Sequence, residues 1–174
     1  MWHAGFVREQ NGYRPSAGQM TTLTRRYLEA LPPRKVYREV ARLVTREEID
    51  NGRDRLPAEM QYFSLASVLH EETFNGEMSQ YFTNSSESDY RLAIEALAQV
   101  GAETQRNLVL RWLSRLPAHV HPESRNEVGT YVFSDPTIQS ELGRIDKEYF
   151  SSMESFYEAM ASYVKTHARA FGIS

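Results

Sequence analysis

The sequence predicts an all-α fold, a single compact bundle of about seven or eight short helices joined by tight Gly/Asn corners and one long loop. Beyond residue 20, apolar residues recur at helical rather than alternating spacing, and helix-start and helix-stop residues fall between these stripes. No repeat of about 20 to 50 residues interrupts the pattern. A chain of 174 residues can bury one core without covalent staples, so we expect one helical domain over residues 20–174.

The first elements follow from the same signals. Residues 1–19 lack clear periodicity and are expected to form an N-terminal arm of uncertain order, despite the turn-like Asn11-Gly12. The first long apolar stripe consists of Val36, Tyr37, Val40, Ala41 and Val44. Thr45 and Glu48 have capping-box spacing, which predicts a helix start at residue 45, and Asn51-Gly52 predicts a helix end.

Later helices obey the same rules. One starts near Pro57 and ends at Asn75-Gly76, and another ends at Gly101. Asp135 followed by proline predicts an N-cap, and the capping-box sequence of residues 151–154 predicts the start of the last helix.

Residues 117–136 are the predicted long loop, with one extended stretch at residues 130–133. The loop contains the one cluster in the sequence that resembles metal ligands: His119, His121, Glu123 and Glu127. Two imidazoles two residues apart can face one ion from an extended strand, but the flanking prolines favour a solvated surface turn. We therefore expect no metal site here.

The bulk composition excludes several classes of protein. The absence of cysteine excludes disulfides and thiolate nucleophiles and favours a reducing compartment, so we expect a cytoplasmic location. No run approaches the roughly 20 apolar residues of a membrane span, so no membrane partner is expected. Glycine loops that cradle phosphates are missing, so no cofactor is expected. Ser162-x-x-Lys165 has the spacing of a serine acylase motif but lacks its partner motifs, which indicates a chance match.

Charge is distributed unevenly, although the formal net charge is only −3. Residues 1–58 carry 11 Lys/Arg against 7 Asp/Glu, whereas residues 59–174 carry 9 against 16. Residues 59–103 alone contain eight carboxylates and one arginine, a net charge of −7. Such polarity bears on partners and association rates rather than on the fold.

The basic front contains a stripe of four arginines, spaced every fourth residue: Arg34, Arg38, Arg42 and Arg46. On one unbroken helix they share an edge. One interpretation is a phosphate-binding or partner-binding stripe. The other is a solvated face balanced by nearby acids, namely Glu29, Glu39, Glu47 and Glu48. Because the chain beyond residue 58 is strongly acidic, we expect no direct binding of nucleic acid.

The acidic middle segment supplies the candidate binding residues. Glu71 and Glu72 precede the Asn75-Gly76 stop, where the helix dipole works against them. We therefore expect a partner for their charge, either an internal arginine or an external ligand. Together with carboxylates in and beyond the next turns, the expected acidic patch is Glu71, Glu72, Glu77, Glu87, Asp89, Glu95 and Glu103.

One group of residues is shared with a known family: Glu72, Asn75-Gly76, Gln80-Tyr81-Phe82, Asn84, Ala96-Leu97 and Gly101-Ala102. Over about residues 57–116 the chain resembles the DNA-mimic protein 19-like family, a domain of unknown function. The family usually has two glycines after the asparagine, whereas here the second is Glu77. The left-handed corner is therefore expected at Gly76.

Four residues of this group are predicted to be structural: Asn75, Gly76, Gln80 and Asn84. The amides of Gln80 and Asn84 lie one helical turn apart, so both can reach back to the unpaired backbone of the Asn75-Gly76 corner. Gly101 is predicted to be the structural stop of the next helix.

The resemblance implies an all-helical protein without established enzymatic activity, and the family's namesake looks like duplex DNA to a bacterial transcription factor. Ten base pairs carry roughly 20 negative charges, far more than residues 59–103, although a homodimer would double their charge.

We expect a non-enzymatic, bacterial-type protein that binds another protein through the acidic patch. The expected partner is a DNA-binding regulator, inhibited by DNA mimicry, or a toxin that an immunity-type protein neutralises. A small metal-dependent hydrolase using His119 and His121 is the alternative from a different class.

Overall fold

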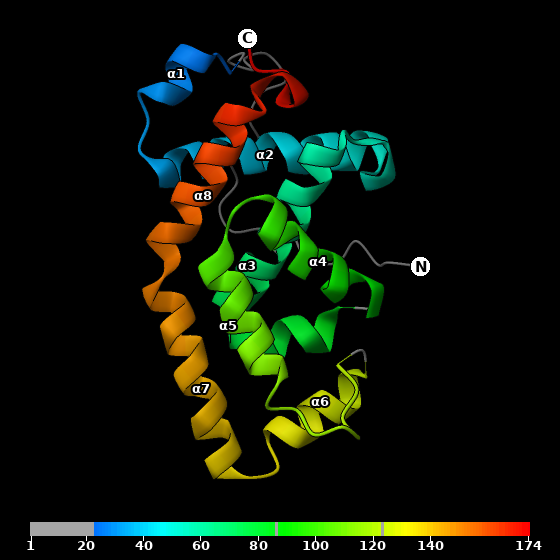
Figure 1. The fold of residues 1–174 in the computed structure, drawn as a ribbon. Coiled ribbons are helices and arrows are strands. Elements are labelled where there is room, and N and C mark those ends of the chain that lie inside the picture. The colour runs from blue at the N-terminus through cyan, green and yellow to red at the C-terminus, as the bar shows by residue number, and fades with distance from the viewer. Residues whose placement is uncertain (1–22, 86, 123) are drawn as a thin grey trace, which may run out of the picture.

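The chain folds into a bundle of helices (Figure 1). The computed structural model describes residues 23–85, 87–122 and 124–174, so the predicted arm of residues 1–19 lies outside the described residues. Within the described ranges every regular element is a helix, which confirms the all-α prediction. The α-helices are α1 (Arg25–Glu29), α2 (Pro33–Asn51), α3 (Ala58–Asn84), α4 (Glu87–Gln99), α5 (Glu103–Leu113), α6 (Arg125–Val132), α7 (Pro136–Ser151) and α8 (Met153–Thr166).

Helix α3 holds the bundle together. It contacts α4, α6, α7 and α2, while α7 and α8 follow each other along one side of the molecule and α2 packs across α8 (Figure 1). The start of the described chain returns to its end, because the backbone N–H of Arg25 donates to the carbonyl of Ser174 at 2.8 Å. No helix in the described ranges combines the length and apolar character that crossing a membrane requires.

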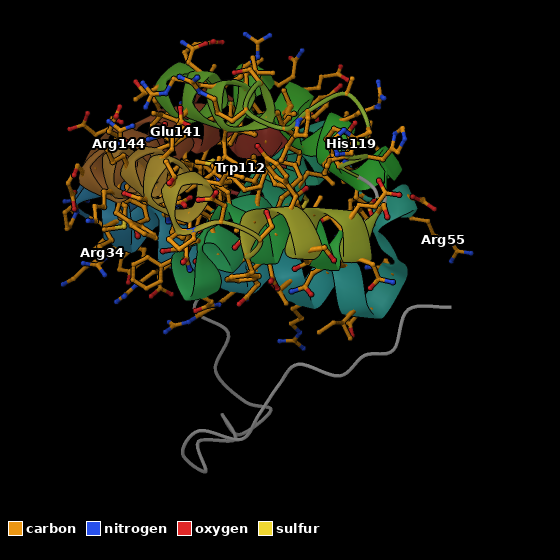
Figure 2. The ribbon with its side chains drawn as sticks, turned by 90° about the horizontal axis from the view of Figure 1, so that it is seen from below. Arg34, Arg55, Trp112, His119, Glu141 and Arg144 are labelled. Atoms are coloured by element: carbon orange, nitrogen blue, oxygen red, sulfur yellow. The ribbon has the colours of Figure 1, made fainter. Side chains whose placement is uncertain are left out.

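The core is built from large aromatic side chains. Trp112 of α5 is fully buried and stacks on Phe82 of α3, with ring centroids 4.9 Å apart. Figure 2 shows Trp112 enclosed by the helices, while Arg34 and Arg55 lie at the periphery. Because Phe82 and its neighbour Tyr81 are both buried, the core anchors the C-terminal part of α3.

Several predicted helix ends are confirmed. The carboxylate of Asp135 accepts the backbone N–H two residues on and caps α7. Gly52 follows α2 with a φ of 83°, a value that favours glycine. After α4, Gly101 has a φ of 77° and the N–H of Ala102 donates to the carbonyl of Leu97 at 2.8 Å, which is the bond pattern of a glycine-terminated helix.

The predicted helix start at Thr45 is wrong, because α2 runs unbroken from Pro33 to Asn51. The capping-box glutamate has other partners. Its carboxylate, that of Glu48, accepts from Arg53 and from Ser64, both at 2.6 Å. The buried stripe that ends at Val44 carries the helix through this point.

The predicted loop over residues 117–136 is also partly wrong, because α6 occupies residues 125–132 and the expected extended stretch at 130–133 is helical up to Val132. Val128 and Val132 lie one helical turn apart and are both buried. The β-branched residues and glycine of this segment favour other structures locally, and burial of the two valines outweighs that preference.

Candidate acidic interaction surface

Helix α3 is broken at its centre. Gly76 has a φ of −164° and a ψ of 35°, and Glu77 has a φ of 67° and a ψ of 176°. The positive φ predicted for Gly76 is therefore found at Glu77, the one non-glycine residue among those described that has it. This region of backbone space is almost restricted to glycine, so Glu77 is held in a strained conformation.

Gly76 leaves room for a neighbouring side chain. A Cβ placed there would displace the side-chain amide of Gln80, which folds back over the break and donates to Glu72. Glycine at residue 76 is thus compatible with this hydrogen bond, and glycine at residue 77 would relieve backbone strain.

A carboxylate from α7 stabilises the restarted helix. Asp146 is 2% exposed, and its Oδ1 accepts the backbone N–H of Met78 at 3.1 Å. Met78 follows the break, so Asp146 acts as an N-cap supplied by another helix. Burial, with the nearby charge of Glu77, raises the pKa of Asp146 to about 6, although the hydrogen bond from Met78 opposes this rise. No local sequence pattern indicates this cap, because Asp146 is 68 residues away from Met78.

The predicted clasp exists, but with another acceptor. The side-chain amides of Gln80 and Asn84 donate to the same oxygen of Glu72, Oε2, at 3.0 and 2.8 Å. Sequence reasoning assigned them to the backbone of the Asn75-Gly76 corner, and it expected an arginine or an external ligand for Glu72. The carboxylate of Glu72 instead joins the two halves of α3, because Glu72 precedes the break and both amides follow the break.

Glu71 is held from the other side. The hydroxyl of Tyr37 on α2 donates to Oε1 of Glu71 at 2.8 Å, while the glutamate remains exposed. Burial, followed by the charge of Glu71, raises the pKa of Tyr37 well above its ordinary value. Among the described residues, neither of these two glutamates therefore has the arginine partner that was one of the two expectations for them.

The other predicted acidic residues are spread along the next helices. Asp89 is half-buried, Glu95 on α4 is exposed, and Glu103 is exposed and pairs with Arg106 at 3.3 Å. The backbone of Glu87 begins α4, and its side chain lies outside the described part of the structure. The acidic corner proper consists of Glu71, Glu72 and Glu77, which flank the break.

A buried histidine supports the helix turn that carries these acids. His70 stacks on Phe156 with ring centroids 4.1 Å apart, and its two ring nitrogens lie 3.4 and 3.3 Å from the hydroxyls of Tyr149 and Tyr157. Burial, with a smaller contribution from the charge of Arg34, lowers the pKa of His70 to about 4. The apolar residues four and seven positions before it, Ala66 and Phe63, place His70 on the buried face of α3, and this signal is present in the sequence.

The four arginines of the stripe are exposed and lie on one continuous helix, α2, as their spacing predicts. Arg42 pairs with Glu39 at 3.1 Å and Arg46 with Asp50 at 3.7 Å. Arg34 lies over the ring of Tyr157, 5.6 Å from its centroid. Of the four acids expected to balance the stripe, Glu39 forms an ion pair with one of its arginines. The carboxylate of Glu47 accepts from Asn51, and that of Glu48 accepts from Arg53 and Ser64.

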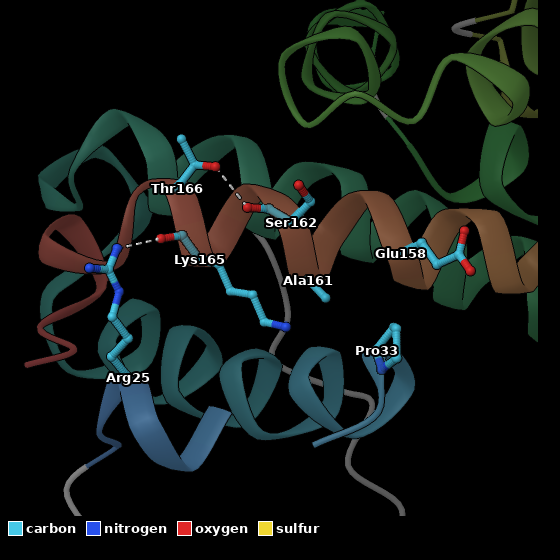
Figure 3. Close-up of a pocket in the computed structure, with 7 residues that line it drawn as sticks. All are labelled: Arg25, Pro33, Glu158, Ala161, Ser162, Lys165 and Thr166. Carbon is cyan, nitrogen blue, oxygen red and sulfur yellow. Dashed lines mark hydrogen bonds between the residues drawn. The ribbon is translucent and has the colours of Figure 1, made fainter. Parts of the chain in front are cut away.

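The two minor candidate sites remain without a reactive arrangement in the described residues. Glu127 accepts from the backbone N–H of His121 at 2.9 Å, and Glu123 lies outside the described residues. Within the described ranges no three potential ligands come together to hold a metal. Ser162 and Lys165 line a hollow between α8, α1 and α2 (Figure 3). Their carbonyls accept from Thr166 and Arg25, and the Lys165 amine extends toward Pro33.

A family comparison identifies the group of proteins to which these features belong. The profile of the DMP19-like protein family matches residues 54–167, which is more than half of the chain. The chain belongs to this family. The match spans α3 to α8, including the broken helix and its cap from α7, whereas α1 and α2 precede it. Searches of curated proteins and of solved structures gave no match.

Proposed function

We propose that this protein acts by binding another protein through the acidic corner formed by Glu71, Glu72 and Glu77, and that it is not an enzyme. The observation that carries the proposal is the geometry of Glu77. Its backbone conformation is almost restricted to glycine, and the family usually has glycine at this point, so a charged side chain is kept at a cost in stability. A binding role for that charge accounts for its presence.

The partner that fits best is a DNA-binding protein of the cytoplasm, inhibited because carboxylates occupy positions that DNA phosphates would take. Membership of the DMP19-like family supports this choice. Carboxylates held by Tyr37 and by the amides of Gln80 and Asn84 are positioned before binding, which reduces the ordering cost of association. Such a surface chiefly accelerates association with a basic partner.

The test is to capture the partner from a native lysate, identify it by mass spectrometry and measure its binding to variants of the pure protein. Glu77→Lys should reduce affinity at least tenfold, because it reverses the exposed charge at the break. Glu158→Lys is the matched control, since Glu158 is an exposed glutamate on α8, away from the corner. Equal losses with both variants, or no loss with Glu77→Lys, would refute the proposal.

A further inference from the structure

A groove of about 670 Å³ lies between α2 and α3. Two hydrogen bonds connect its two walls, one near each end. Tyr37 donates to Glu71 at one end, and Ser64 donates to Glu48 at the other. The distance along α2 between these ends is about 17 Å, from the helical rise of 1.5 Å per residue. The groove therefore matches roughly three turns of a docked helix.

The groove is apolar along its centre and leaves hydrophobic side chains exposed. Ala41, Val44 and Phe63 contribute to its lining. At its edges, Ile49 is 76% exposed and Val68 is 42% exposed. Exposed apolar residues beside a concave surface are typical of a site that buries them against a partner.

The two walls carry opposite charge. On the α2 side stand Arg42 and Arg46, each paired with an exposed or half-buried acid of the same helix, and Glu48, which pairs with Arg53; the α3 wall carries Glu71 and Glu72. A nucleic acid or another polyanion would be attracted by one wall and repelled by the other. An amphipathic segment with cations along one flank and anions along the other complements both walls.

We propose that the groove between α2 and α3 binds an amphipathic helix of the protein partner, with an apolar side chain between Ile49 and Val68, basic residues along Glu71 and Glu72, and acidic residues along Arg42 and Arg46. This inference rests on the proposed function and deepens it. The acidic corner steers the partner, and the groove supplies the apolar contact that slows its dissociation.

The test uses fluorescein-labelled helical peptides of about 12 residues, the length that the groove accommodates. One peptide has a leucine stripe with lysines on one flank and glutamates on the other, and its control peptide has the same leucine stripe with glutamine at all of these flanking positions. By fluorescence anisotropy we expect the full-length protein to bind the charged peptide at least tenfold more tightly than the control peptide. Equal binding of both peptides, or binding of neither, overturns the inference.

Val68→Asp should weaken the preferred peptide about tenfold or more, because it places a charge at the apolar edge. Leu92→Asp is the matched control, since Leu92 on α4 is 46% exposed and lies outside the groove. Circular dichroism checks that both variants remain folded. An unchanged affinity of Val68→Asp overturns the inference.

Two further measurements test whether a second copy of the chain or its own N-terminal segment occupies the groove instead. A dimer in sedimentation that Val68→Asp dissociates would assign the groove to a second copy, and intramolecular cross-links from residues 1–22 into it would assign it to this chain's own N-terminal segment. Either result overturns the inference. If the captured protein is lost with Glu77→Lys and retained with Val68→Asp, the groove inference fails while the proposed function stands.

Discussion

Replacing Glu77 by glycine should stabilise the protein, which is the reverse of the usual effect of glycine in a helical segment. Glu77 has a φ of 67° and a ψ of 176°, and a non-glycine residue in this region costs about 1–3 kcal/mol. Glycine removes that strain but loses about 0.5–1 kcal/mol through the greater freedom of the unfolded chain. The substitution also removes a carboxylate that raises the pKa of buried Asp146.

The net gain is about 1 kcal/mol, which corresponds to a rise in Tm of roughly 2–4 °C for a domain of this size. Thermal and urea unfolding followed by far-UV circular dichroism measure it. Glu77→Ala is the control, because it removes the charge and keeps the Cβ that causes the strain. If Glu77→Gly lowers the free energy of unfolding, or has the same free energy of unfolding as Glu77→Ala, backbone strain at Glu77 does not explain its effect.

We predict three other outcomes. Glu72→Ala should cost about 1–2 kcal/mol of unfolding free energy, because it leaves two amides without their acceptor, and Glu72→Gln should cost less; equal losses in urea unfolding would contradict the clasp. Asp146 has a raised pKa, so its contribution to stability is full below about pH 3.8 and is lost as the pH rises through about 6. His70 has a lowered pKa, so its contribution is full above pH 6.5 and is lost as the pH falls through about 4. When the pH is lowered from 6.5 to 4.5, the free energy of unfolding of Asp146→Asn should therefore fall more than that of wild type, by on the order of 2 kcal/mol. Parallel curves of unfolding free energy against pH for the two proteins would contradict the raised pKa of Asp146. In gel-shift assays the protein should not bind duplex DNA, and submicromolar, salt-sensitive binding would be the opposite result.

Sequence reasoning recovered what depends on local patterns. Apolar stripes, the Asp135 cap and the glycines after α2 and α4 are determined by neighbouring residues, and the structure contains them as predicted. The break in α3 was located correctly, but its geometry was not, because the positive φ falls on Glu77 rather than Gly76. Local preference alone favours glycine at that angle, and the preference is overridden here.

What sequence reasoning missed depends on long-range contacts. The cap from Asp146 and the hydrogen bond from Tyr37 to Glu71 join residues 68 and 34 positions apart, and no local pattern encodes such a pairing. The same holds for His70, whose partners belong to α7 and α8. The acidic patch was identified by residue type, whereas the division between Glu72 as a structural acceptor and Glu77 as an exposed charge required the structure.

We propose above that a basic protein partner associates at the acidic corner beside the α3 break. The most direct test of this proposal is the association rate constant of the captured partner, measured for wild type and Glu77→Lys at about 50 and 200 mM salt, between which the Debye length falls from roughly 14 to 7 Å. We expect the wild-type rate constant to fall steeply with salt, and we expect that of Glu77→Lys to be lower at low salt and less dependent on salt. Equal rates for the two proteins at both salt concentrations would contradict the proposal.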